Sequence, residues 1–152
     1  MESTDLRIGN YVYYENTTHI ISGIMGNKIY SWWVKDGIAV IEYEQKDIGG
    51  AQVENPYMDV ISQYEPIPLT EEWLLKLGFS LKDYKEGYIG IEHKAGGIIT
   101  DFVLTYPKVM GEFQKHFAWE HSKWKYNTIE YVHQLQNLFY ILTNEELTIK
   151  KN

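Results

Sequence analysis

The sequence contains no cysteine, which excludes disulfides, thiolate nucleophiles and thiolate-ligated zinc or iron–sulfur centres. It also has no run of about 18 apolar residues, the length that a membrane-spanning helix needs. The first residues, MESTDLRIGNYVYY, are acidic and polar, whereas a secretory signal is basic and then apolar. We therefore expect a cytoplasmic protein without export or membrane anchoring.

The sequence also lacks the signatures of nucleotide-dependent and serine-dependent catalysis. There is no Gly-x-Ser-x-Gly, no phosphate-binding loop and no dinucleotide fingerprint. Four glycines lie in hairpin positions and do not lead into a helix: Gly87, Gly90, Gly96 and Gly97. We expect no cofactor.

Histidines are few and scattered. His116 and His121 are five residues apart, a spacing that places them on opposite faces of a strand and aligns them poorly on a helix. We therefore expect no metal site. His19 and His93 are expected to fill out strand surfaces.

Basic residues are in deficit, since 14 Lys and Arg stand against 21 Asp and Glu and give a net charge of -7. This charge repels phosphate backbones at long range, so we do not expect general nucleic-acid binding. Hydrophobic residues make up 44% and aromatic residues 15% of the 152 residues. A chain of this length and composition can bury a real core, in one domain or in two small ones that share an interface.

The N-terminal third has the pattern of short antiparallel strands. Runs rich in Tyr, Val, Ile and Trp cover about residues 10–15, 19–25, 29–35 and 38–43. They are separated by turns at 16–18, at Gly26-Asn27 and at Asp36-Gly37, the last being the best hairpin signal because both residues tolerate positive φ. Four short strands in so few residues must curl to enclose a core. We predict a small SH3-like antiparallel β-barrel over residues 1–65.

A connecting segment and a short helix follow. Residues 44–68 carry Gly49-Gly50 and three prolines around one possible strand at 58–62, and a soft boundary is placed near Pro66. In LTEEWLLKLGF, residues 69–79, Thr70 can cap a helix that Gly78 ends. Leu69 and Leu74 hold the positions of a hydrophobic staple across that cap.

Residues 66–152 complete an α+β fold. Strands are predicted at 88–93, 98–106 and 112–119, forming a three-stranded antiparallel meander flanked by two helices. Asn127, with Glu130 three residues later, predicts the start of the last helix, and Asn144 suits its left-handed end. Six apolar residues fall on one continuous arc of that helix, in the angular order Leu138, Tyr131, Leu142, Leu135, Phe139 and Val132. The helix is expected to pack by the part of this arc that holds Tyr131, Leu135, Leu138 and Leu142.

The opposite side of the last helix carries a polar strip. Its members are His133, Gln136, Asn137 and Tyr140. They could present donors and acceptors to a ligand or to another chain. The alternative is that they are a solvated helix face or make contacts within the protein.

The surplus of aromatic residues is a second candidate binding surface. Trp32 and Trp33 lie in SWW at 31–33, and Trp119 and Trp124 lie in the locally basic segment 107–127. Aromatic residues of this kind are enriched at protein interfaces. Interleaved with Lys115 and Lys123, they could also stack on bases, although strand alternation produces the same string.

Asp83, Glu92 and Lys94 imitate the carboxylates and the lysine of one class of magnesium-dependent nucleases. Glu-x-Lys arises readily by chance in a chain this rich in both residues, and EQK at 44–46 is a second occurrence. Exposed charges at a strand end are the simpler interpretation.

Three segments together resemble a known family: DLRIGNYV from Asp5, EPIPLTEEWLLKLGF from Glu65, and YVHQLQNLFYILTNEEL from Tyr131. The family comprises small uncharacterised proteins encoded by Bacteroidetes genomes, their prophages and their phages. The resemblance implies a phage or mobile-element context and a cytoplasmic setting. It carries over no activity and no catalytic residue.

The absence of catalytic motifs favours a non-enzymatic accessory protein that acts by contact with a protein partner. One alternative is a phage inhibitor of a host defence nuclease, in which the charge of -7 imitates nucleic acid. A further alternative is a metal-dependent nuclease that uses Asp83, Glu92 and Lys94.

Overall fold

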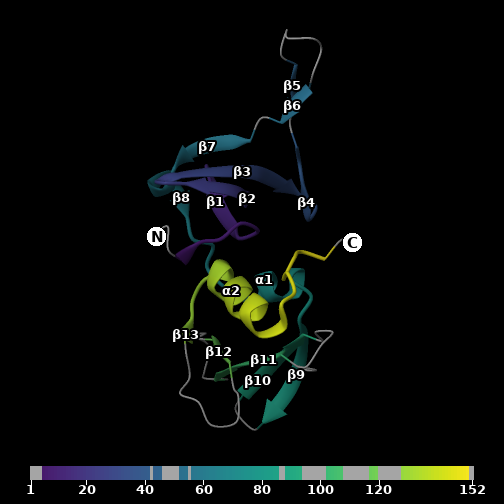
Figure 1. Cartoon of the computed structure of the whole chain (residues 1–152). Coiled ribbons are helices and arrows are strands. Elements are labelled where there is room, and N and C mark those ends of the chain that lie inside the picture. Colours follow the sequence, from purple (N-terminus) through teal and green to yellow (C-terminus); the bar gives the residue numbers. More distant parts are fainter. Residues whose placement is uncertain are drawn as a thin grey trace. The chain divides into compact units, whose positions relative to one another are not determined.

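The computed structural model describes residues 5–41, 43–45, 52–54, 56–85, 88–93, 102–107, 117–119 and 128–150. The chain forms two compact units that meet between Ile67 and Pro68. Figure 1 shows antiparallel sheets in both units, and the two α-helices of the described residues belong to the second unit. The α+β class expected from the sequence is confirmed. Neither described helix is both long and apolar enough to cross a membrane.

The N-terminal unit is built on a six-stranded antiparallel sheet in the order β4-β3-β2-β1-β8, with β7 also paired to β3. Its strands are β1 (Tyr11–Tyr14), β2 (Thr17–Met25), β3 (Lys28–Lys35), β4 (Ile38–Ala39), β7 (Tyr57–Val60) and β8 (Tyr64–Glu65). No pairing among the described strands closes this sheet into a barrel. The strand predicted at 38–43 is shorter in the structure, since β4 ends at Ala39. A separate hairpin, β5 (Tyr43–Gln45) with β6 (Gln52–Glu54), begins at Tyr43 and otherwise lies in the segment predicted as a connection.

Three tight turns set the register of the first four strands, and Gly26-Asn27, with φ of 61° at Gly26, joins β2 to β3 as predicted. Asp36 and Gly37 both have positive φ, 51° and 77°, and join β3 to β4 as predicted. The first turn is made by Glu15 and Asn16, with φ of 48° and 62°, and not by residues 16–18. Thr17 pairs with Tyr14 across this two-residue turn, so β2 begins two residues earlier in the sequence than predicted.

The segment from β7 to β8 spans the sheet. β7 pairs with β3, the single 3₁₀ turn η2 (Ile61–Gln63) follows, and β8 then pairs with β1. One continuous stretch of nine residues therefore contacts both sides of the β1–β2–β3 meander. Beneath it lies a core of Leu6, Val12, Ile21, Ile29 and Tyr64. Each such aliphatic side chain contributes roughly 1.5–3 kcal/mol when fully buried.

The second unit contains α1 (Glu71–Lys76), α2 (Val132–Thr143) and a five-stranded antiparallel sheet in the order β13-β12-β11-β10-β9. The strands are β9 (Ser80–Lys85), β10 (Tyr88–His93), β11 (Phe102–Pro107), β12 (Phe117–Trp119) and β13 (Thr128–Ile129). The sequence predicted three of these five strands and missed β9 and β13. β9 pairs with β10, which follows it, and β13 pairs with β12, which precedes it. The charged residues of β9 and the two-residue length of β13 give a weak strand signal in the sequence.

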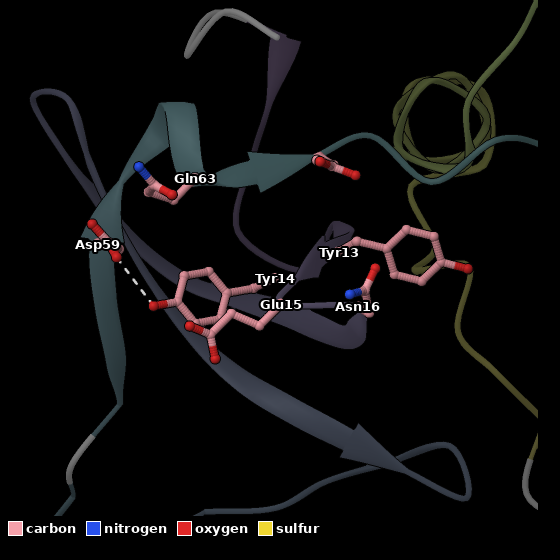
Figure 2. A pocket seen from close by; sticks show the side chains of 7 residues that line it. Tyr13, Tyr14, Glu15, Asn16, Asp59 and Gln63 are labelled. Atoms are coloured by element: carbon pink, nitrogen blue, oxygen red, sulfur yellow. Dashed lines mark hydrogen bonds between the residues drawn. The ribbon is translucent and has the colours of Figure 1, made fainter.

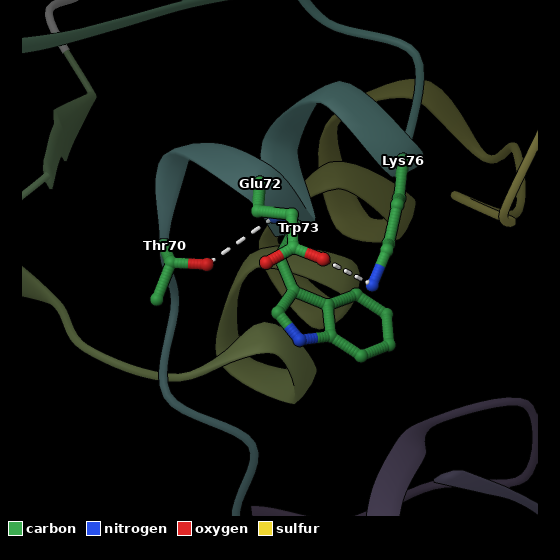
Figure 3. A network of polar contacts seen from close by, with 4 residues as sticks. All are labelled: Thr70, Glu72, Trp73 and Lys76. Atoms are coloured by element: carbon green, nitrogen blue, oxygen red, sulfur yellow. Dashed lines mark hydrogen bonds and ion pairs between the residues drawn. The ribbon is translucent and has the colours of Figure 1, made fainter.

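Local chemistry explains α1. Figure 3 shows the Thr70 hydroxyl accepting a hydrogen bond of 3.3 Å from the backbone N–H of Trp73. Lys76 forms an ion pair of 2.7 Å with Glu72, which lowers the pKa of that carboxyl, and its Nζ lies 5.2 Å from the centroid of the Trp73 ring. Gly78 ends the helix with φ of 90°, and a Cβ there would meet the side chain of Lys150. The predicted cap and stop are both confirmed.

The start of α2 differs from the prediction. Tyr131 is the N-cap, and the Gln134 side-chain oxygen accepts from the backbone N–H groups of Glu130 at 2.9 Å and Tyr131 at 3.2 Å. Asn127 as the cap was wrong because the residues after it, Thr128–Ile129, are extended and pair with β12. The predicted left-handed end is confirmed, since Asn144 has φ of 58°.

The buried side of α2 is rotated from the predicted face. Leu135 is buried as expected, but Tyr131, Leu138 and Leu142 are only partly buried. The fully buried apolar side chains besides Leu135 are Val132 and Phe139, which lie at one end of the predicted arc. The helix therefore turns part of its predicted polar side inward.

We expect Thr70→Ala to lower the free energy of unfolding by about 1 kcal/mol, because it leaves the Trp73 amide without its capping acceptor. Urea denaturation followed by circular dichroism at 222 nm measures this change. Thr70→Ser keeps the acceptor oxygen and is the control. Equal destabilisation by both variants would show that the hydroxyl contributes nothing as a cap.

Candidate functional site

Two adjacent hollows open on the N-terminal unit and share Tyr14 and Glu15. The first, of about 260 Å³, is lined by Tyr13, Tyr14, Glu15, Asn16, Asp59, Gln63 and Glu65 (Figure 2). The second, of about 290 Å³, is lined by Tyr14, Glu15, Thr17, His19, Trp33 and Tyr57. None of these residues is Lys or Arg. We call the first hollow the acidic hollow and the second the aromatic hollow.

The strand pairings bring these side chains together from distant parts of the chain. The β1–β2 turn presents Glu15 and Asn16, and the positive φ of both residues is what a two-residue turn requires. β7 pairs with β3 so that Asp59 lies opposite Ile29 and Tyr57 opposite Ser31. Residues more than 40 positions apart thereby line one surface.

Tyr14 and Asp59 are linked directly between the two hollows. The Tyr14 hydroxyl donates a hydrogen bond of 3.1 Å to Asp59 Oδ2, as Figure 2 shows, and the backbone N–H of Val60 donates to Oδ1 at 2.7 Å. The hydrogen bond to the Asp59 carboxylate is the main reason that the pKa of Tyr14 lies above its usual value. Asp59 is therefore an oriented carboxylate, and Tyr14 stays protonated beside it.

The aromatic rings around the second hollow face different directions. The His19 and Tyr57 rings are 5.2 Å apart and inclined by 87°, and the Tyr14 and His19 rings are 5.4 Å apart and inclined by 67°. Tyr14 and Tyr57 are 6.3 Å apart at 50°. Tyr57 is 39% exposed, whereas His19 is only 2% exposed. Solvent therefore reaches the walls of the hollow far more than the imidazole.

A line of hydrogen bonds fixes His19. The Thr17 hydroxyl donates its single proton to the Tyr14 carbonyl at 2.7 Å, so its contact of 3.0 Å with His19 Nε2 requires the proton on Nε2. In the neutral ring Nδ1 then accepts from the Ser31 hydroxyl at 3.1 Å.

Beyond Ser31 the line reaches the core. Ser31 Oγ lies 3.1 Å from the Tyr64 hydroxyl, which also donates to the Ile29 carbonyl at 3.3 Å. Ser31, having given its proton to His19, accepts here from Tyr64, whose proton is shared between the two oxygens. Burial lowers the pKa of His19, in agreement with this neutral assignment.

Among the predicted aromatic residues whose side chains the structure describes, Trp33 lines one of these two hollows. Its side chain is partly buried, and its Nε1 is buried without a hydrogen-bond partner in the part of the chain that the structure describes. Trp32 is 7% exposed and belongs to the core. Trp119 lies in β12, and Trp124 lies outside the described residues, as do Lys115 and Lys123.

The predicted polar strip on α2 is largely internal. His133 is 3% exposed, with its ring stacked on Tyr131 at 5.8 Å, and Gln136 is fully buried. The Gln136 amide donates to the Leu147 carbonyl at 3.0 Å. Asn137 is partly buried, and Tyr140 is 38% exposed. A binding role for these four residues stays a prediction, and Tyr140 is the most accessible of them.

The nuclease residues also stay a prediction. Asp83 lies in β9 opposite Ile89, three positions along β10 from Glu92, and Lys94 lies outside the described residues. Over the described ranges, no group of three His, Asp or Glu residues could hold a metal ion.

Sequence reasoning missed Tyr14, Tyr57, Asp59 and the role of His19. The available signal was the tyrosine pair in YVYYEN beside the acidic turn residue Glu15. Nothing in the sequence indicates that β7 would reach this turn. Comparisons of the chain with protein families, with curated proteins and with solved structures find no match.

We expect His19 to make folding less favourable as pH falls. Its folded-state pKa lies below the unfolded value of 6.5, so the unfolded chain takes up a proton first. The stability that neutral His19 contributes is thus complete above about pH 6.5 and declines below it. The two groups hydrogen-bonded to His19, the Thr17 and Ser31 hydroxyls, carry no charge that would oppose this, and Glu15, which lines the same hollow, is exposed to solvent.

The measurement is the free energy of unfolding by urea between pH 7.5 and 5, for the wild type and for His19→Gln. The advantage of the wild type should shrink as the solution is acidified, and other titrating groups cancel in the difference. A constant difference over this range would contradict the neutral, buried assignment.

Proposed function

We propose that the chain is a non-enzymatic binding protein whose N-terminal unit recognises a positively charged side chain of a protein partner. The observation that carries the proposal is the pairing of the two hollows. Three carboxylates, Glu15, Asp59 and Glu65, line the acidic hollow without any basic residue, and aromatic rings line the other. Cations bind both to carboxylates and to the faces of Tyr and Trp rings.

The carboxylates differ in how far they are already engaged. Asp59 accepts two hydrogen bonds, from Tyr14 and from its neighbour Val60. Glu15 and Glu65 are exposed, and the described residues provide them with no ion pair. Both are therefore open to a cation from outside, and the net charge of -7 attracts a basic partner at long range.

The hollows offer little for catalysis. His19 is the one imidazole that lines them, and both of its nitrogens are held by Thr17 and Ser31. A general base needs a nitrogen within reach of the substrate proton. This arrangement supports binding in preference to turnover.

The SH3-like barrel and the phage context belong to the same proposal. The passage of β7, η2 and β8 from β3 across to β1 is the route by which a short sheet curls around its core, which supports the barrel. The sequence resemblance supports the phage or mobile-element setting and a cytoplasmic location.

The acidic hollow also supports a second candidate, an inhibitor that occupies the basic cleft of a host defence nuclease. In such an inhibitor the carboxylates stand in for phosphates. Binding would then depend on charge, and the aromatic rings would matter less.

The test is affinity capture with the tagged full chain from its native bacterial background, with mass spectrometry and a nuclease-treated control for nucleic acid. Tyr57→Ala removes an exposed ring of the aromatic hollow. Tyr140→Ala is the matched control, because Tyr140 on α2 is 38% exposed against 39% for Tyr57. A Glu15→Gln, Glu65→Gln double variant removes charge without changing shape.

We expect one stoichiometric protein partner that Tyr140→Ala retains and Tyr57→Ala and the double variant lose, with capture weakening as NaCl is raised. Loss in the double variant alone would favour the nuclease inhibitor. Loss in Tyr140→Ala alone would place the partner on the α2 strip and contradict the proposal. Capture of nucleic acid would contradict it as well.

A further inference from the structure

We infer that the aromatic hollow selects a methylated ammonium group, the head of a methylated lysine side chain, over a bare ammonium or a guanidinium. The inference rests on the proposed function and names the cation that it recognises. Three features of the hollow carry it: the mutual inclination of its rings, the scarcity of free acceptors, and the neutrality of its imidazole.

Ring inclination decides between planar and tetrahedral cations. A guanidinium is flat and stacks on one face or between parallel faces. The rings of Tyr14, His19 and Tyr57 are instead inclined to one another by 50° to 87°. His19 is 2% exposed. The surfaces that a ligand reaches are therefore the Tyr14 and Tyr57 rings, inclined by 50°, together with Trp33. A tetrahedral methylated ammonium can contact inclined surfaces of this kind at once.

The scarcity of free acceptors decides between bare and methylated ammonium. A lysine ammonium carries three N–H donors that are strongly hydrated and need acceptors when they leave water. The Thr17 oxygen, both His19 nitrogens and the Tyr14 hydroxyl are already hydrogen-bonded. Of the side chains that line the hollow, this leaves the Glu15 carboxylate and the Tyr57 hydroxyl as acceptors, too few to satisfy three N–H donors that have left water. The Glu15 carboxylate provides charge. Methylation removes the N–H donors and keeps the charge, so a methylated ammonium loses less hydration free energy when it contacts the aromatic side chains of the hollow.

The third feature is electrostatic. Trp33 adds a π face whose buried Nε1 is a donor and no acceptor. His19 is neutral in the hydrogen-bonded line from Thr17 to Ser31, so it does not repel a cation beside it. The hollow, of about 290 Å³, has the size of a site for one small organic group.

The first test uses choline and its neutral isostere 3,3-dimethylbutan-1-ol as probes, titrated against the full chain and followed by NMR, including the Trp33 indole N–H signal. Cation–π attraction should make choline bind about fivefold to tenfold more tightly than the isostere. Tyr57→Ala should abolish the difference, while Tyr57→Phe, which keeps the ring, and Tyr140→Ala should retain it. Equal binding of the two probes would show simple apolar contact and overturn the inference.

The second test uses one Gly/Ser peptide that carries lysine, trimethyl-lysine or arginine at its centre. We expect trimethyl-lysine to bind at least about fivefold more tightly than the other two, and more tightly than free choline. Lysine binding as well as trimethyl-lysine, with both weakened by Glu15→Gln, would overturn the inference and leave the proposed function standing. Failure of all three peptides would overturn both, and choline binding more tightly than every peptide would overturn the assignment to a protein side chain.

Discussion

Buried polar groups must be paired, and the N-terminal unit depends on how it meets this constraint. Thr17 and His19 of β2, Ser31 of β3 and Tyr64 of β8 form one hydrogen-bonded line that ends at a backbone carbonyl in the core. An unpaired member would cost about 1–3 kcal/mol, so the line strongly favours the register in which all members meet. Burial of Val12, Ile21 and Ile29 stabilises the same strand pairing, but apolar contacts are not directional and do not select one register. The hydrogen-bonded line does select it.

The same line shapes the candidate site. Because both nitrogens of His19 are hydrogen-bonded, its ring is held in one orientation, inclined by 67° to the Tyr14 ring and by 87° to the Tyr57 ring. Tyr14 is fixed in turn by Asp59, whose other oxygen is bound to the Val60 amide. Two of the side chains that line the aromatic hollow, His19 and Tyr14, are thus held in place before a ligand binds, which lowers the entropy that binding costs.

Sequence reasoning succeeded where the determinant is local. The Asp36-Gly37 turn, the Thr70 cap, the Gly78 stop and the Asn144 end all follow from backbone preferences or from acceptors within three residues. It failed where the determinant is distant. Asn127 has good capping chemistry, but the pairing of Ile129 with Phe117 keeps the chain extended up to Glu130.

The candidate site was beyond prediction for the same reason. Tyr14 and Asp59 are 45 positions apart and meet only because β7 pairs with β3. His19, expected to fill a strand surface, is buried, and one of its two hydrogen-bond partners, Ser31, comes from another strand, where it is itself bonded to Tyr64. Conversely, a polar pattern on α2 did not mean a polar surface, since Gln136 is buried where the chain after the helix returns a carbonyl to it.

Charge and aromatic surface act over different distances, which makes their combination on one unit informative. The excess of carboxylates attracts a basic partner over a range of about 8–10 Å at moderate salt and speeds encounter, but it does not distinguish one cation from another. The inclined rings act only in contact, where shape and hydration separate a methylated ammonium from a bare one. Replacing the carboxylates with amides should therefore slow association, whereas removing an aromatic ring should speed dissociation. The two contributions are separable because Glu15 reaches the hollow from the β1–β2 turn and Tyr57 reaches it from β7.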